Sequence, residues 1–193
     1  MNVTIMKRVA VAGAVEKRLT FRSGRTLILY RLTAMSVLVL WLAFLVVFLP
    51  LAIDFWVLLL AGVVAAYVIV FGMSPLLTEH WLTRSRLILR QGWYFRAVIP
   101  FSDIDSIEPA DRTGPLQAPL GIHRPLGQPA LFVTGGRTNL VTLRLRRSIR
   151  FWQSFGLAVR EIVFDVVDRP RFLQAFEERR ALLPPIEAEG PYA

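Results

Sequence analysis

One stretch of the chain, residues 32–78, decides the fold: LTAMSVLVLWLAFLVVFLPLAIDFWVLLLAGVVAAYVIVFGMSPLLT. Residues 32–53 carry no formal charge, Asp54 interrupts, and residues 55–78 again carry none. In a helix, at about 1.5 Å per residue, each run reaches roughly 33–36 Å. That length crosses a hydrocarbon core about 30 Å thick. The sequence therefore predicts two consecutive transmembrane helices, at about residues 32–53 and 55–78.

The charges on either side of these runs predict an orientation. Seven basic residues precede the first run: Lys7, Arg8, Lys17, Arg18, Arg22, Arg25 and Arg31. Four more follow the second run closely: Arg84, Arg86, Arg90 and Arg96. The turn between the runs, marked by Pro50 and Asp54, has no basic residue. Because basic residues stay on the cytoplasmic side, we expect a multi-pass protein of the plasma membrane with both termini in the cytoplasm.

Composition excludes several kinds of chemistry. The chain has 193 residues, of which 54% are hydrophobic, and a net charge of +9. It has no cysteine, which excludes disulfides, thiol nucleophiles and cysteine-bound metals. Two histidines are too few for a metal site built from histidine alone. No phosphate-binding glycine loop, nucleophile elbow or metalloprotease motif occurs. We therefore expect no enzyme, no cofactor and no metal site.

The hydrophobic pattern divides the chain into four parts. Residues 1–30 form a basic cytoplasmic lead-in, residues 31–78 the two-span hairpin, residues 79–183 one β-rich cytoplasmic domain, and residues 184–193 a flexible tail. We expect residues 1–29 of the lead-in to be interfacial or strand-like, and Ser23-Gly24 indicates a turn within them.

Short apolar segments separated by turns predict the strands of the domain. They are RLILR at 86–90, WYFRAVIPF at 93–101, a short element around Ile104 and Ile107, ALFVT at 130–134, and the alternating segments 140–145 and 160–166. Gly135-Gly136 indicates a hairpin turn after residues 130–134. In the last strand we expect Ile162, Phe164 and Val166 to point inward, and Glu161 and Asp165 to point outward.

A helix is predicted after the last strand. Asp168 is a suitable N-cap, Pro170 fits the first turn, and Phe172, Ala175 and Phe176 share one face. Pro184-Pro185 would end it. Before these elements, residues 114–129 are rich in proline and glycine with interspersed leucines, and we expect an ordered loop that packs on the domain or on the membrane surface.

The segment WLTRSRLILRQG at residues 81–92, continuing as VIPFSDI at residues 98–104, resembles the opening strands of bacterial pleckstrin-homology (PH-like) membrane proteins. In that family a short membrane hairpin precedes a PH-like domain, and the helix at 168–180 matches the closing helix. The likeness covers roughly residues 32–183. It implies an α+β membrane protein, in which a two-helix transmembrane hairpin is followed by a small PH-like β-barrel or sandwich with a C-terminal capping helix. It implies no catalytic residues.

Two basic clusters are candidates for contacts with anionic lipid headgroups. The first is the predicted opening hairpin, where the resemblance suggests Arg84, Arg86, Arg90 and Arg96 as phosphate ligands. The second is RRSIRFWQSF at residues 146–155, in which Arg146, Arg147 and Arg150 stand beside Trp152. For each there is a simpler alternative: positive charge that only sets orientation in the first cluster, and aromatic side chains that point into the barrel in the second.

The acidic and histidine side chains suggest no chemistry. Asp103, Asp105 and Glu108 have no nucleophile or metal partner in the sequence, and we expect them at the surface or in turns. We expect His80, beside Glu79, to lie at the membrane interface.

These observations predict a membrane-anchored interaction or scaffolding module with no catalysis. The expected partners are the lipid bilayer, anionic headgroups, and a membrane protein or a second copy of the chain. Nucleic acid is not expected, because membrane orientation explains the excess positive charge. The alternative is an accessory or oligomerising subunit of a transporter or channel complex.

Overall fold

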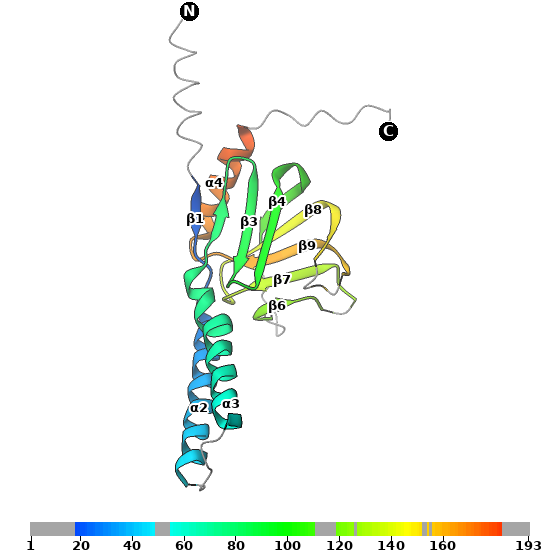
Figure 1. The fold of residues 1–193 in the computed structure, drawn as a ribbon. Coiled ribbons are helices and arrows are strands. Elements are labelled where there is room, and N and C mark those ends of the chain that lie inside the picture. The colour runs from blue at the N-terminus through cyan, green and yellow to red at the C-terminus, as the bar shows by residue number, and fades with distance from the viewer. Residues whose placement is uncertain are drawn as a thin grey trace, which may run out of the picture.

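The structure, a computed structural model, describes residues 18–48, 55–110, 119–125, 127–151, 154 and 156–182. It is an α+β protein in which two apolar helices project from a body made of two β-sheets and a C-terminal helix (Figure 1). The N-terminal tail and the predicted turn at Pro50 and Asp54 lie outside the described residues.

The two apolar helices lie side by side. α2 spans Thr26–Phe48, and α3 spans Phe55–Tyr67. α3 continues through a π-helical turn, η1 (Val68–Met73), and a 3₁₀ turn, η2 (Ser74–Leu77). Pro75 is in this last turn and has no N–H to continue the α-helical pattern. The first predicted run was too short at its start, since α2 begins at Thr26 and encloses Arg31.

The first sheet is antiparallel, in the order β1-β2-β3-β4. Its strands are β1 (Leu19–Phe21), β2 (His80–Leu82), β3 (Arg86–Gln91) and β4 (Phe95–Pro100). β3 and β4 match the predicted hairpin. β1 comes from the predicted lead-in and pairs with β2, so the edge of the sheet is built from chain that precedes both apolar helices.

The second sheet has the order β5-β8-β9-β7-β6. A 3₁₀ turn, η3 (Phe101–Asp103), leads from the first sheet into it. Its strands are β5 (Ile104–Pro109), β6 (Gly121–His123), β7 (Ala130–Thr134), β8 (Leu140–Arg150) and β9 (Ala158–Asp165). The hairpin predicted at Gly135-Gly136 is wrong, because β9 lies between β7 and β8 and pairs parallel with β7.

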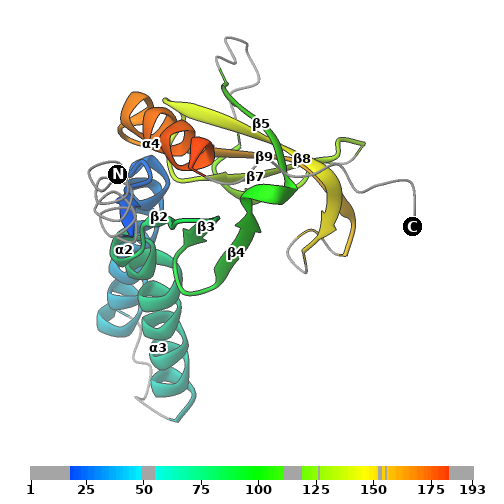
Figure 2. The same cartoon turned by 90° about the horizontal axis from the view of Figure 1, so that it is seen from above.

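One hydrophobic core joins both sheets to α4 (Arg169–Ala181), which lies beside them at one end (Figure 2). Its largest buried side chains come from all three parts: Leu82, Leu87, Phe95, Ile99, Leu131, Leu143, Ile162, Phe164, Phe172 and Phe176. The predicted helix is confirmed: the side chain of Asp168 accepts a hydrogen bond from the Arg171 N–H at 3.3 Å, and Phe172, Ala175 and Phe176 are buried.

The alternation predicted for β9 is correct on one face only. Ile162, Phe164 and Val166 are buried as expected, but Val163 and Asp165 are buried too. Val163 packs in a second small cluster with Phe132, because β9 is an inner strand with both faces covered. The prediction that Asp165 points outward is therefore wrong.

The described part of the proline-rich stretch packs on the domain. β6 pairs with β7, Thr134 Oγ1 donates to the Pro119 carbonyl, and Arg124 Nη2 donates to the Ala158 carbonyl at 3.3 Å. Residues 111–118 and 126 lie outside the described residues.

Candidate functional site at the junction of the helices and the first sheet

The outer face of the first sheet carries aromatic and basic side chains. Strand register places Trp81, Ile88 and Val98 next to one another across β2, β3 and β4. The guanidinium carbons of Arg18 and Arg90 lie 3.5 and 4.4 Å from the centre of the Trp81 ring. Such cation–π contacts hold two positive charges on one indole, each worth about 0.5–1 kcal/mol at an exposed site.

The structure divides the first predicted arginine cluster. Arg90 and Arg96 are cross-strand partners at one end of the β3–β4 hairpin. Arg84 lies in the turn before β3 and Arg86 at the other end of the strand, roughly 13 Å from Arg90 at about 3.3 Å per residue. Arg18, which sequence reasoning did not include, joins Arg90 instead. In the sequence, only the short alternating segment that forms β1 could have indicated that Arg18 lies beside the first sheet.

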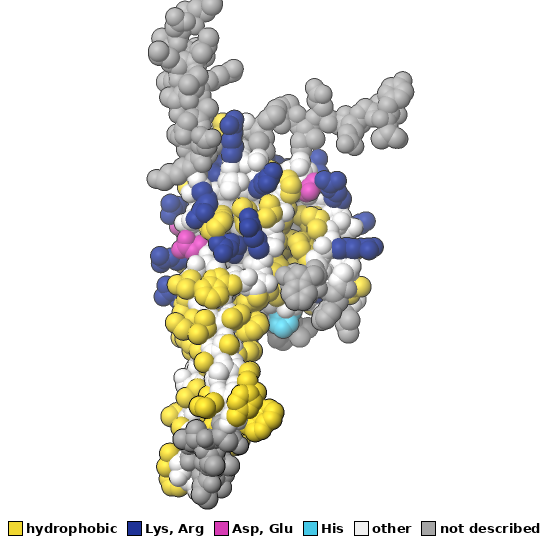
Figure 3. Space-filling model, viewed as in Figure 1, with side chains coloured by type: hydrophobic (Ala, Val, Ile, Leu, Met, Phe, Trp, Pro, Cys, Tyr) yellow, Lys and Arg dark blue, Asp and Glu magenta, His cyan; other side chains and the backbone are white. Residues whose placement is uncertain are grey.

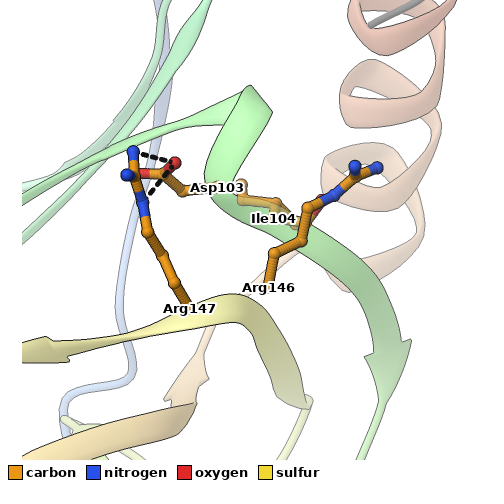
Figure 4. Close-up of polar contacts among 4 residues, drawn as sticks. All are labelled: Asp103, Ile104, Arg146 and Arg147. Atoms are coloured by element: carbon orange, nitrogen blue, oxygen red, sulfur yellow. Dashed lines mark hydrogen bonds and ion pairs between the residues drawn. The ribbon is translucent and has the colours of Figure 1, made fainter. Parts of the chain in front are cut away.

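The second predicted cluster does not converge on one site. Arg146 and Arg147 are consecutive residues of β8, and both reach the η3–β5 segment, where they diverge to different partners (Figure 4). Arg147 donates to Asp103 Oδ1 from Nη2 at 2.7 Å and from Nε at 3.1 Å, and Arg146 Nε donates to the Ile104 carbonyl at 3.3 Å. Arg150 is exposed, and Trp152 lies outside the described residues.

Of the three carboxylates predicted at the surface or in turns, Asp103 lies in a turn but is buried there. Asp105 and Glu108 are exposed as expected, but the Asp103 side chain is buried in η3, next to Arg147. Its charge is balanced by the guanidinium, which itself stays largely in solvent. The pair connects η3, the turn that follows β4, to β8, and therefore has a structural role.

A buried carboxylate connects the segment before α2 to the second sheet. Asp165 accepts hydrogen bonds from the N–H of Gly24 and, at 2.5 Å, from the N–H of Gly135. Burial raises the pKa of Asp165, and the backbone N–H groups of Gly24, Gly135 and Gly136 oppose that shift. A Cβ added to Gly24 would stand 2.8 Å from the Gly136 Cα, so glycine is required for this approach.

His80 is buried close to Asp165, and the prediction of an interfacial position is wrong. Its Nδ1 accepts from the Arg90 N–H at 3.2 Å, so the ring proton is on Nε2. Nε2 lies near the Asp165 backbone but has no hydrogen bond of normal geometry to any described residue. Burial lowers the pKa of His80 from 6.5 to about 4. The residue is therefore neutral and structural.

Arg31 joins the two apolar helices to the first sheet. Its Nη1 donates to the Phe71 carbonyl in η1 and to the Tyr94 hydroxyl, both at 2.8 Å. The β3–β4 turn is bound by residues at the end of the second apolar helix. The Gly92 N–H donates to Thr78 Oγ1 at 2.8 Å, and the Trp93 N–H donates to Ser74 Oγ at 3.1 Å. The helix pair is therefore fixed to the domain by polar contacts rather than by a flexible linker.

The remaining surface of the helices is apolar and open. Two segments are long and apolar enough to cross a membrane, Thr26–Leu45 and Phe55–Leu77, and only 11% and 6% of their most apolar windows is buried. A groove of about 620 Å³ runs between the helices, with Ala43, Ala61 and Ala65 among its apolar lining residues. Figure 3 shows basic side chains on the body, directly next to this hydrophobic surface.

The side chains described at this junction can supply hydrogen-bond donors and positive charge to a ligand. No group of three or more metal-ligating side chains occurs within the part of the chain that the structure describes. The arginines offer planar, permanently charged hydrogen-bond donors, which suit phosphate and carboxylate. Comparisons with family models, with curated proteins and with solved structures find no match to this chain.

Proposed function

We propose that this protein is a membrane-anchored interaction module. Its two apolar helices form a hairpin through the plasma membrane, and its two-sheet domain stands at the cytoplasmic surface, where it contacts headgroups or neighbouring membrane proteins. The proposal needs no catalysis. Membership of the PH-like membrane family is part of it: two sheets that share one core closed by α4 support that assignment, while the proline- and glycine-rich stretch at residues 114–129 is longer than the resemblance implies.

The main support for the proposal is that the apolar side chains of the helices are exposed. Leu40, Val47 and Trp56 are 70%, 74% and 69% exposed, whereas a core helix of a soluble protein buries such side chains. Covering one large apolar side chain is worth about 1.5–3 kcal/mol. A surface with this many exposed apolar side chains is not stable in water. Lipid is the solvent that satisfies it along the whole length of both helices.

The charge distribution supports the cytoplasmic placement. Arg22 and Arg25 stand just before α2, and Arg84, Arg90 and Arg96 follow η2 on the body. All are at the end of the helix pair that carries the sheets, which is the positive end expected in the cytoplasm.

Tethering explains how weak contacts would suffice. The hairpin holds the domain beside the membrane, which raises the effective concentration of any membrane-borne partner to the millimolar range typical of short tethers, about 1 mM or more. The face around Trp81, with Arg18, Arg90 and Arg96, is suited to an acidic partner. Arg147 is less suited to an acidic partner, because its charge is already balanced by Asp103.

Membrane fractionation tests the proposal. The full-length protein should sediment with membranes, stay there through an alkaline carbonate wash, and be released by mild detergent as a folded protein. Release by carbonate alone, with the fold intact, would overturn the hairpin and with it the module.

A second candidate function, an oligomerising or accessory subunit, is favoured by the groove between the helices. Small side chains such as Ala43 and Ala61 let a third helix approach closely. Cross-linking in native membranes should then capture a second copy or another membrane protein through α2 or α3. The interaction module alone predicts cross-links through the sheets.

A further inference from the structure

A small polar pocket lies where the chain passes between the helices and the first sheet. It has a volume of about 120 Å³ and lies between the segment that precedes α2 and the segment that follows η2. Its lining residues are Arg22, Ser23, Arg25, Ile28, Pro75, Leu76, Thr78 and Glu79. It is separate from the predicted arginine clusters and from the face around Trp81.

The pocket has one positive charge in excess. Arg22 Nε donates to Glu79 Oε1 at 3.0 Å, so these two charges balance. The Arg25 side chain makes no hydrogen bond or ion pair with any other residue in the described ranges. The Thr78 hydroxyl already accepts from the Gly92 N–H. The groups available to an incoming anion are therefore the Arg25 guanidinium, the remaining N–H groups of Arg22, and the Ser23 hydroxyl.

The apolar surroundings place the pocket at the edge of the lipid. Leu76 and Leu77, beside it in η2, are 45% and 71% exposed, and Ile28 lines its floor. Arg31, whose guanidinium donates to the Phe71 carbonyl, follows Arg25 by less than two helical turns. Side chains change from apolar to charged at this level, which is where phospholipid phosphates lie in a bilayer.

We infer that this pocket binds the phosphate of a phospholipid headgroup, with Arg25 as its main ligand. The inference rests on the proposed membrane hairpin. A guanidinium matches phosphate oxygens with two parallel hydrogen bonds. The acyl chains would then run down over Ile28 and Leu76. The lipid would fix the angle of the helix pair against the domain.

Lipid retention by the purified full-length protein tests the inference. The protein is delipidated in mild detergent, phosphatidylglycerol is added back, and bound lipid is counted by native mass spectrometry. Arg25→Gln should weaken binding about tenfold, the loss expected for a charge-assisted hydrogen-bonded pair. Arg160→Gln, the same charge change at an exposed position of β9 in the second sheet, is the control and should bind like the wild type.

Two further probes identify the source of the phosphate. Diacylglycerol, which has the same chains without the phosphate, should not bind the site. Millimolar inorganic phosphate should not displace the phospholipid; if it does, the pocket is an anion site filled from solution and the lipid assignment is wrong. Equal lipid retention by Arg25→Gln and the wild type overturns the inference, even when both proteins remain in the membrane. Failure of the membrane hairpin itself would appear earlier, as wild-type protein in the soluble fraction.

Discussion

At the scale of single residues, the most constrained side chain is His80. It is neutral because burial lowers its pKa from 6.5 to about 4, while its Nδ1 accepts from the Arg90 backbone. The unfolded chain binds a proton on His80 below about pH 6.5, but the folded chain binds it only near pH 4. The stabilising contribution of neutral His80 is therefore complete above pH 6.5 and is lost as the pH falls toward 4.

The lowered pKa of His80 predicts a loss of stability at low pH. Between pH 7 and pH 4 the wild type should lose about 3 kcal/mol through His80, and His80→Asn, which keeps an acceptor for the Arg90 N–H, should not. Asp165 acts in the opposite direction, because its raised pKa weakens the fold as the pH rises above 3.8. The measurement is therefore the difference between the melting curves of the two proteins in detergent at each pH. Parallel pH profiles would contradict the assignment.

A second residue-scale prediction separates structural from surface arginines. Arg147→Gln leaves the buried Asp103 carboxylate without its guanidinium and should cost about 1 kcal/mol of stability. Arg150→Gln, an exposed neighbour on the same strand, should change stability by less than about 0.5 kcal/mol. Thermal unfolding in detergent measures both. Equal effects would show that the Asp103 pair has no special role.

Residue partners were the least predictable part of the molecule. The sequence shows that Arg146, Arg147 and Arg150 are close along the chain, but only the fold shows that Asp103 lies opposite Arg147. Likewise His80 and Asp165 are 85 positions apart (165 − 80) and meet only because β2 and β9 pack together in the core. A pattern of neighbouring residues contains no information about such contacts.

At the scale of elements, long and periodic segments were predicted well. The two apolar runs, the β3–β4 hairpin and α4 follow from local composition, N-capping and alternation. β1 could not be located within the lead-in, which was expected to be interfacial or strand-like, because three residues are too few to show a period. The Gly135-Gly136 hairpin was wrong because these glycines serve another purpose: they let the Gly24 segment approach and bind the Asp165 carboxylate through backbone N–H groups.

That approach gives the element-scale prediction. In Gly24→Ala the new Cβ would stand 2.8 Å from both the Gly136 Cα and Asp165 Oδ2, and a backbone atom cannot move aside easily. We expect a loss of about 2 kcal/mol or more, as for overpacked cores. Gly62→Ala in α3 is the control: a Cβ there meets nothing within 4 Å, and stability should stay within about 1 kcal/mol. If both variants melt alike, the glycine contact does not hold the segment.

At the scale of the whole molecule, the helix pair and the sheets form one unit. β1 precedes α2 and pairs with β2, which follows η2, so the two apolar helices are connected to neighbouring strands at one edge of the first sheet. Arg31 and the Asp165 contacts reinforce this junction. The orientation of the domain relative to the helices is thereby set by the fold.

Sidedness is the most direct test of the central claim, and the chain suits it because it has no native cysteine. Single variants Arg84→Cys, on the body, and Asp54→Cys, between the two apolar runs, are exposed to a membrane-impermeant maleimide in sealed right-side-out vesicles. With both termini in the cytoplasm, Asp54→Cys should be labelled at once and Arg84→Cys only after the vesicles are opened. Labelling of both variants in sealed vesicles would contradict it.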